Sequence, residues 1–375
     1  MTAILRNTLT FSEEQGMLLD TAAEFFRQKS PIAEVRRQLL TEEGFDAAVW
    51  REMAALGWTG LAVPEAHGGS GFGLAAAVVL AEPMGRYLSA TPLLSTQLFV
   101  QGVLAGTEEV RDRYLGRIAA GAAATVALLE ADGNWDLSSA RAAFTVSGGD
   151  VRLSGRKTFV SDAAVAELLL ISGRCEDAPA LVVVEASELP QGALRRETIL
   201  DETRRSYQVV LDGISVPSSR LIAGASARTA LAAIRDAALL LFSAEAAGGI
   251  AGTLDLIVDY LNTRTAFGRK IGSFQALKHP SVDILIGLER SRSHVYHAAS
   301  LIAAGEEPEA ALRMAKAEAS ESFAFAGDRA VQFHGGFGFT YECDAQLFLR
   351  RALWLQYAFG DAAHHRKHLA QLLLG

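Results

Sequence analysis

The apolar residues of the N-terminal third of the chain recur with the spacing of amphipathic helices. From Ser12 to about Ala120 they return every three or four positions, as Leu18, Ala22 and Phe25 do within the first such run. The strict alternation of apolar and polar residues that is typical of strands is absent from this region. The pattern therefore predicts a helical N-terminal domain over residues 1–122.

Between residues 123 and 225 the pattern changes to short β-rich runs separated by turn residues. The runs cover residues 144–146, 151–153, 168–172, 181–184 and 207–211. Ser147-Gly148-Gly149-Asp150 joins the first two runs, and glycine accepts the positive φ angles that tight hairpins need. The middle segment is therefore predicted to be an antiparallel β domain.

Helical periodicity returns from residue 226 and continues to residue 375. Long periodic runs cover residues 229–263, a stretch after Gln275, residues 309–332 and residues 345–374. The predicted fold is therefore mainly α with a middle β domain, in the order helices, small sheet and helical bundle.

Composition narrows the function classes. Half of the 375 residues are hydrophobic (50%) and 21% are charged, which is enough apolar material for a large core. The formal net charge is −8. A general nucleic-acid binder needs a clustered Lys/Arg surface, so this balance argues against nucleic acid as a partner while leaving room for a local basic pocket.

The sequence shows no segment typical of export or membrane insertion. No early stretch combines a basic start, an apolar run and a small-residue cleavage site. The most apolar stretches, residues 74–81 and 237–242, are shorter than the roughly 20 residues that a spanning helix needs. Cys175 and Cys343 lie far apart without metal-ligand spacing. We expect a soluble, cytoplasmic protein that inserts in no membrane and holds no metal.

Two motifs suggest chemistry but have simpler explanations. Gly69, Gly71 and Gly73 precede a helix, yet a dinucleotide fingerprint belongs in a strand-turn-helix unit, and the preceding region is helical. A loop that needs positive φ angles is the better interpretation. His364 and His368 share a helix face as metal ligands would, but no third ligand is apparent. A solvated or subunit-facing basic helix explains them better.

Two further segments carry more information. The loop of residues 262–279 places Arg264 beside other cations and glycines, so it could hold an anionic diphosphate through bidentate hydrogen bonds, or it could be a plain basic turn between helices. Residues 332–338 could let a flat ring lie against open backbone. Their alternative is a helix C-cap with Gly335 in the left-handed conformation.

Taken together, four ordered segments resemble motifs of the acyl-CoA dehydrogenase family over nearly the whole chain. Residues 58–69 (WTGLAVPEAHGG) resemble its LG-x-x-G-(I/L)-x-x-PE-x-x-GG pattern, and residues 155–161 (GRKTFVS) resemble G-x-K-x-W-I-T. Residues 264–275, with RTAFG and GSFQ, are similar to R-x-x-FG…FQ, and residues 332–339 (QFHGGFGF) are similar to Q-x-x-GG-x-GF.

The resemblance implies a fold and a cofactor. The family fold is an N-terminal helical domain, a β-barrel-like middle domain and a C-terminal four-helix bundle, here residues 1–122, 123–225 and 226–375. FAD is the implied cofactor, held non-covalently at a subunit interface. The residues that the resemblance assigns to FAD are Arg264, Phe267 and Gln275 against a neighbouring subunit's cofactor, Gln332, Gly335 and Gly336 along its adenosine diphosphate, and Phe159 and Ser161 beside the flavin.

Two departures from the family pattern affect the reaction. The segment matching T-E-P-x-x-G-S-D is residues 129–136 (LEADGNWD), so the usual threonine is missing. The family's catalytic glutamate in Y-E-G-T falls on Phe359, which cannot accept a proton. The other family position for this base, on the long helix before the arginine loop, falls on Ala238.

Two carboxylates remain as candidate bases. Glu245 lies seven residues after Ala238, within about 20° of the same helical face, and stands in an otherwise apolar stretch. It could be a base with a raised pKa, or a glutamate bonded to a basic partner across the bundle. Asp361 is the weaker candidate, because its counted position points it toward the flavin.

These residues support two readings of function. The first is an acyl-CoA dehydrogenase that converts an acyl-CoA thioester to the trans-2-enoyl-CoA, as in fatty acid or steroid degradation, and passes electrons to an electron-transfer flavoprotein or a similar acceptor. The second is a non-catalytic subunit that completes the FAD site of a paralogous subunit. The resemblance implies a dimer or tetramer in either case.

Overall fold

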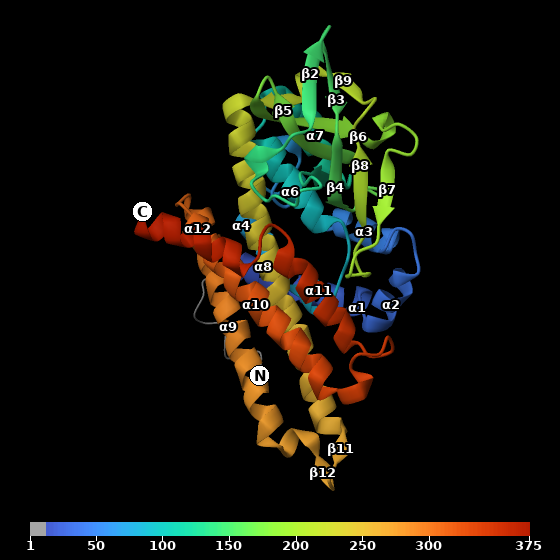
Figure 1. Cartoon of the computed structure of the whole chain (residues 1–375), viewed down its shortest axis with the longest axis vertical. Coiled ribbons are helices and arrows are strands. Elements are labelled where there is room, and N and C mark those ends of the chain that lie inside the picture. The colour runs from blue at the N-terminus through green and yellow to red at the C-terminus, as the bar shows by residue number, and fades with distance from the viewer. Residues whose placement is uncertain (1–12) are drawn as a thin grey trace. The chain divides into compact units, whose positions relative to one another are not determined.

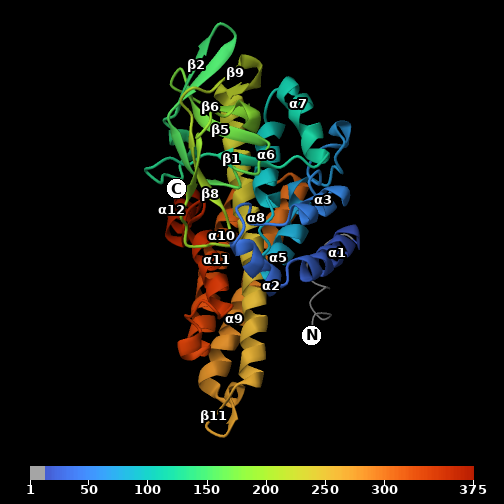
Figure 2. The ribbon, with the colours of Figure 1, turned by 90° about the vertical axis from the view of Figure 1, so that its right-hand side faces the viewer.

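The computed structural model describes residues 13–375, which divide into two compact units (Figures 1 and 2). The bundle unit contains residues 13–37, 75–89 and 239–375, and the sheet unit contains residues 38–74 and 90–238. Along the chain, helices are followed by strands and then by helices again. This order confirms the predicted mainly α fold with a middle β domain.

The N-terminal third is helical, as its periodicity predicts. Its helices are α1 (Glu13–Lys29), α2 (Ile32–Leu39), α3 (Ala47–Ala55), α4 (Gly73–Ala76), α5 (Val78–Arg86), α6 (Leu93–Leu104) and α7 (Glu108–Ala119). The start of α7 is set locally, because the Thr107 hydroxyl accepts a hydrogen bond from the Val110 N–H at 3.3 Å. Glu108 and Glu109 then place negative charge at the positive end of the helix dipole.

The glycine-rich segment between α3 and α4 forms the predicted loop. It contains a short 3₁₀ helix, Glu65–His67, followed by Gly68, Gly71 and Gly73 with φ angles of 80°, 67° and 75°. A Cβ at Gly69 would lie 2.1 Å from the carbonyl oxygen of Val63. Side chains cannot occupy these positions without strain, so the glycines serve the loop's backbone geometry.

The middle domain contains one large sheet and one small sheet. Its strands are β1 (Ala124–Ala127), β2 (Ala143–Ser147), β3 (Asp150–Ser154), β4 (Arg156–Ser161), β5 (Leu168–Cys175), β6 (Ala178–Glu185), β7 (Leu194–Glu197), β8 (Ser206–Val210), β9 (Ser215–Pro217) and β10 (Leu221–Ala223). The large sheet has the order β10-β6-β5-β2-β3-β9, with β1 paired to β5, and the small sheet has the order β4-β8-β7.

The strands are not all antiparallel, which corrects the prediction for this domain. β1 pairs with β5 in parallel, and β2 meets β5 in parallel at Ala143 and Arg174. Parallel neighbours need a long connection, and about 40 residues separate β1 from β5. The β2–β3 hairpin is as predicted, since Ser147 pairs with Asp150 around two glycines that both have positive φ.

The C-terminal part forms a bundle of long helices. Its elements are α8 (Gly224–Thr263), β11 (Thr265–Ala266), β12 (Arg269–Lys270), α9 (Gln275–Ala304), α10 (Glu309–Phe333), α11 (Ala345–Tyr357) and α12 (Ala362–Leu374). α10 packs against α9, α11 and α12, and α9, α10 and α11 run side by side in both views (Figures 1 and 2). α8 is long and apolar enough to cross a membrane, but 94% of its most apolar stretch is buried inside the protein. α8 is therefore a core helix.

Glycines let α8 and α5 approach until their backbones touch. A Cβ at Gly248 would lie 1.7 Å from the carbonyl oxygen of Glu82, and one at Gly85 would lie 1.8 Å from that of Glu245. Only hydrogen fits at these two positions. The contact fixes the section of α8 that carries Glu245 within the core of the bundle unit.

Candidate functional site

The basic segment predicted to bind a diphosphate forms one end of the bundle. The backbone N–H of Arg264 donates to Tyr260 in the last turn of α8 at 2.9 Å, and the N–H of Ile271 donates back to Arg264 at 3.0 Å. Between them, β11 and β12 form a hairpin whose turn residues Phe267 and Gly268 have φ angles of 53° and 77°. A bulky residue at such an angle is strained, and Phe267 is 94% exposed.

The glycine segment, residues 332–338, begins in the last turn of α10 and lies beside the last turn of α8. α10 ends at Phe333, and Gly335 follows with a φ of 62°, as the C-cap interpretation predicts. The His334 ring stacks on the Tyr260 ring at a centroid distance of 4.0 Å and an interplanar angle of 25°. The arginine segment and the glycine segment, about 70 residues apart in sequence, therefore meet at this stack.

This end of the bundle has the chemistry to hold an FAD diphosphate. All six residues assigned there by resemblance are exposed in the chain: Arg264, Phe267, Gln275, Gln332, Gly335 and Gly336. Within the described part of the chain, the Arg264 guanidinium makes no hydrogen bond or ion pair. A Cβ built at either glycine would meet nothing within 4 Å, so the backbone there is open to a ligand. An available guanidinium beside open backbone suits an anionic, flat ligand.

In the sheet unit, β4 carries the two residues expected beside the flavin. Lys157 pairs with Val209 and Val160 with Tyr207, so β4 holds one extra residue, which is a β-bulge. Phe159 lies in this bulge with a φ of 53° and is 55% exposed. Among the described residues, the Ser161 hydroxyl has no hydrogen-bond partner, so it is available to a ligand.

The Glu197 carboxylate holds the bulge in place. It accepts hydrogen bonds from the Thr158 hydroxyl, from the Phe159 N–H at 2.9 Å and from the Ser206 hydroxyl at 2.8 Å. Sequence analysis missed Glu197. Its only local signal was a charged residue at the end of a short strand, and the residues that it binds come from two other strands.

The segment that departs from the T-E-P motif is held by an ion pair between a buried lysine and a partly buried glutamate. Leu129, in place of the threonine, is buried, and Glu130 accepts a hydrogen bond from Lys157 Nζ at 2.8 Å. Glu130 also accepts the backbone N–H groups of Arg141 and Ala142 at 2.9 Å. Although burial opposes it, these hydrogen bonds hold the pKa of the Glu130 carboxyl below its usual value. The segment is ordered, but it offers no hydroxyl at the threonine position.

Both positions of the family's catalytic glutamate hold apolar side chains. Phe359 has a φ of 58°, and its ring contacts the Phe242 ring edge-on at 5.7 Å. Phe242 in turn contacts Trp354 at 5.5 Å. Ala238 is fully buried. An aromatic cluster thus stands where the resemblance places the base on the C-terminal segment.

Glu245, the first candidate base, is paired with an arginine. Arg351 Nη1 on α11 donates to Glu245 Oε1 at 2.6 Å, and both side chains have no solvent exposure. The structure thus brings Glu245 to a basic partner across the bundle, which is the alternative left open by its sequence. The sequence did not single out Arg351, whose signal was a pair of arginines inside the otherwise apolar stretch of residues 347–355.

Asp361, the second candidate, caps a helix. Its Oδ1 accepts the His364 N–H at 2.8 Å at the start of α12. The backbone just before it is fixed by Lys316, whose ammonium donates to the carbonyl oxygens of Leu355, Gln356 and Gly360 at 2.8, 3.2 and 3.0 Å. Burial lowers the pKa of Lys316 to about 7. The segment around Phe359 is therefore firmly held.

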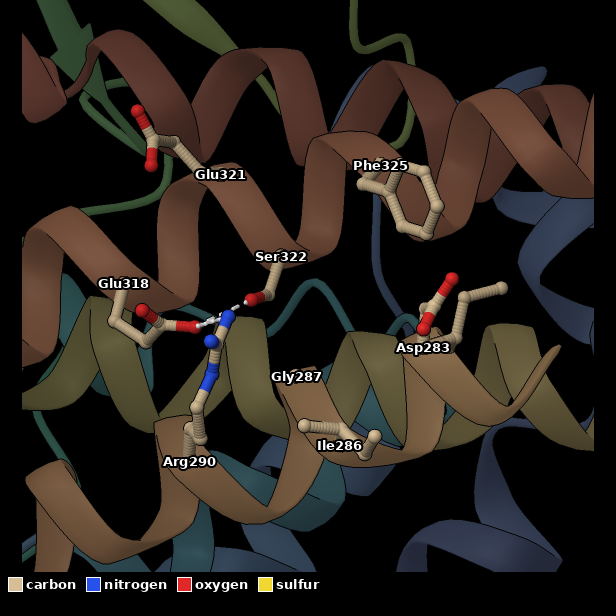
Figure 3. Close-up of a pocket in the computed structure, with 9 residues that line it drawn as sticks. Asp283, Ile286, Gly287, Arg290, Glu318, Glu321, Ser322 and Phe325 are labelled. Atoms are coloured by element: carbon tan, nitrogen blue, oxygen red, sulfur yellow. Dashed lines mark hydrogen bonds and ion pairs between the residues drawn. The ribbon is translucent and has the colours of Figure 1, made fainter. Parts of the chain in front are cut away.

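A surface pocket of about 360 Å³ lies apart from these residues, between α9 and α10 (Figure 3). Arg290 and Glu318 form an ion pair at 2.7 Å across it, and the Ser322 hydroxyl donates to Glu318 at 2.9 Å. No residue predicted for the flavin or for the base lines this pocket. In the described part of the chain, no group of three His, Cys, Asp or Glu residues could hold a metal ion.

Comparison with known proteins agrees with these features. Residues 12–122 match the family model for the acyl-CoA dehydrogenase N-terminal domain, and residues 229–374 match that for the C-terminal domain. Acyl-CoA dehydrogenase IpdE2 of Mycolicibacterium smegmatis is 30% identical over 91% of this chain and 93% of its own length.

Two solved structures share the fold. The Tcur3481-Tcur3483 steroid ACAD is 28% identical with a TM-score of 0.86, covering 96% of this chain and 98% of its own. Butyryl-CoA dehydrogenase of Megasphaera elsdenii is 20% identical with a TM-score of 0.88, covering 98% of this chain and 100% of its own. FAD is the cofactor of the family that these matches identify, as the sequence predicted. The chain belongs to the acyl-CoA dehydrogenase family.

Proposed function

We propose that this chain is an FAD-site-completing subunit of a hetero-oligomeric acyl-CoA dehydrogenase and does not itself remove the α-proton. The observation that carries this is the Glu245–Arg351 pair, with both side chains fully buried and 2.6 Å between the charged atoms. A carboxylate that neutralises a buried guanidinium is poorly placed to take a proton, because protonation would leave the cation uncompensated. Phe359 and Ala238 cannot replace it.

The chain's contribution would be binding rather than proton transfer. When bound, FAD supplies the acceptor for the β-hydride of the thioester. Arg264 would bind its diphosphate, and the open backbone at Gly335 and Gly336 would lie along the adenosine portion. The partner subunit would supply the carboxylate. The two chain names of the Tcur3481-Tcur3483 steroid ACAD support a two-chain assembly. The steroid named in its description supports a bulky acyl group as the substrate class.

A second candidate is the complete acyl-CoA dehydrogenase reaction on this chain, forming the trans-2-enoyl-CoA and passing electrons to an electron-transfer flavoprotein or a similar acceptor. It is favoured by the exposed Phe159 and the available Ser161 hydroxyl, which leave a flavin-facing strand on this same chain. In this reading Glu245, or more weakly Asp361, would be the base.

One experiment separates the two candidates. The chain is purified alone, its oligomeric state and FAD content are measured, and its visible spectrum is followed anaerobically during titration with short-chain, long-chain and steroid-side-chain acyl-CoAs. The expected result is an FAD-binding dimer or tetramer whose flavin is not bleached by any thioester. Bleaching by one thioester would favour the second candidate. A colourless monomer that takes up no added FAD would contradict both.

A further inference from the structure

We propose that Tyr260 and His334 are positioning residues that set the distance between the two FAD-binding segments of the bundle. The inference rests on the proposed function, because it concerns how this chain binds the diphosphate end of FAD. Its observation is the ring stack between the last turn of α8 and the end of α10, at 4.0 Å and 25°. Neither residue is itself assigned a contact with the cofactor.

The stack is joined to the arginine segment through the backbone. The Tyr260 carbonyl accepts the Arg264 N–H at 2.9 Å, and Lys270 Nζ donates to the Thr263 carbonyl at 2.7 Å. These bonds close the end of α8 and fix where the hairpin leaves it. A shift of the Tyr260 ring would therefore move Arg264 with it.

On the other side, the stack is joined to the glycine segment. His334 is 6% exposed and is the C-cap residue of α10, between Gln332 and the left-handed Gly335. Its Nδ1 lies 2.7 Å from the Ala330 carbonyl, and because a carbonyl only accepts, Nδ1 carries the proton. This bond fixes the plane of the ring, so Tyr260 meets a ring whose orientation is already set.

The energetic role of the stack is to prepare the site before the cofactor arrives. Ordering two flexible segments at the moment of binding weakens affinity, and holding them in advance removes that cost. An aromatic stack contributes enough beyond its buried area to change affinity by about three- to tenfold. Loss of the stack should therefore weaken FAD binding without removing any group that touches FAD.

The test uses the full-length chain with FAD and with ADP, the latter as a probe of the diphosphate end alone. The His334→Ala and Tyr260→Leu variants remove the stack, whereas His334→Phe and Tyr260→Phe keep it. His297→Ala is the matched control, because His297 is exposed on α9 and lies outside both the segment of residues 262–279 and the stack. FAD and ADP dissociation constants are measured by titration, and thermal unfolding shows whether each variant folds.

The expected result is binding of both ligands about three- to tenfold weaker in the two stack-removing variants. The Phe variants and His297→Ala should bind like the wild type. Combining His334→Ala with Tyr260→Leu should cost no more than either change alone, because both remove one interaction. Hydrogen exchange of the Arg264 and Ile271 amides should be faster in the stack-removing variants, which is independent of any activity.

Three outcomes would overturn the inference. Wild-type affinity and exchange in both stack-removing variants would show that the stack sets nothing. An equal loss of affinity for FAD and ADP in His334→Phe and His334→Ala would assign the effect to the imidazole and not to stacking. A wild-type chain that binds neither FAD nor ADP would overturn the proposed function together with this inference. The titration of the wild type is enough to distinguish this outcome from the other two, in which the wild type binds both ligands.

Discussion

Replacing Glu245 by Gln keeps the shape of the side chain but removes the charge that pairs with Arg351. Both side chains have no solvent exposure, so water cannot compensate the arginine that remains. Breaking a buried ion pair on one side costs about 3–5 kcal/mol. Coulomb's law at an effective dielectric constant of about 20 gives an attraction of about 6 kcal/mol at the 2.6 Å between the charged atoms, which is an upper limit for this loss. Because the side chains of glutamate and glutamine have nearly equal volume, the substitution leaves no cavity that would add to this cost.

The assay is denaturant unfolding of the purified protein, followed by circular dichroism. We expect the free energy of unfolding of Glu245→Gln to fall by about 3–5 kcal/mol. Glu306→Gln is the control, because it makes the same change of charge on an exposed side chain and should stay within about 0.5 kcal/mol of the wild type. Replacing the pair by Leu at 245 and Met at 351 should recover most of the stability, because no charge is then left buried.

The same variant tests the reasoning about function. If Glu245 is structural, Glu245→Gln destabilises the chain, and the wild type shows no thioester-driven flavin reduction to lose. The opposite result would refute it: stability within about 1 kcal/mol of the wild type, together with a fall of roughly two to four orders of magnitude in flavin reduction by an acyl-CoA. Glu245 would then be the base, and its partner Arg351 would serve to tune it.

Two further predictions concern the cofactor and pH. Arg264→Ala should bind FAD at least about tenfold more weakly, because a charge-assisted hydrogen bond contributes about 1.5–3 kcal/mol, and unchanged flavin content after dialysis would show that the arginine is not a ligand. Burial, with nearby cations, lowers the pKa of His365 from 6.5 to about 3. Between these two pH values the unfolded chain therefore binds a proton on His365 that the folded chain does not. The contribution of His365 to the free energy of unfolding is therefore complete above about pH 6.5. Below that pH it falls by up to about 1.4 kcal/mol per pH unit. In urea unfolding at a series of pH values, His365→Gln should flatten this slope, whereas His297→Gln, at an exposed position, should leave it unchanged.

Local signals in the sequence determined the order of the elements. Helical periodicity from residue 229 to 263 predicted the long helix that the structure places at Gly224–Thr263. The glycine pair at 148 and 149 predicted the β2–β3 hairpin. Such signals suffice because helix periodicity and turn geometry depend on residues only a few positions apart. The ordered motifs then identified the family, which the comparisons confirmed.

Only the tertiary structure decided which distant residues meet. The sequence left Glu245 between a base and an ion-pair partner, and the choice depended on Arg351, 106 positions further along the chain. It likewise gave no sign that Tyr260 stacks on His334 or that β1 pairs in parallel with β5. Such contacts arise from how whole helices and strands pack, and a buried charge takes its meaning from the group that packing places beside it.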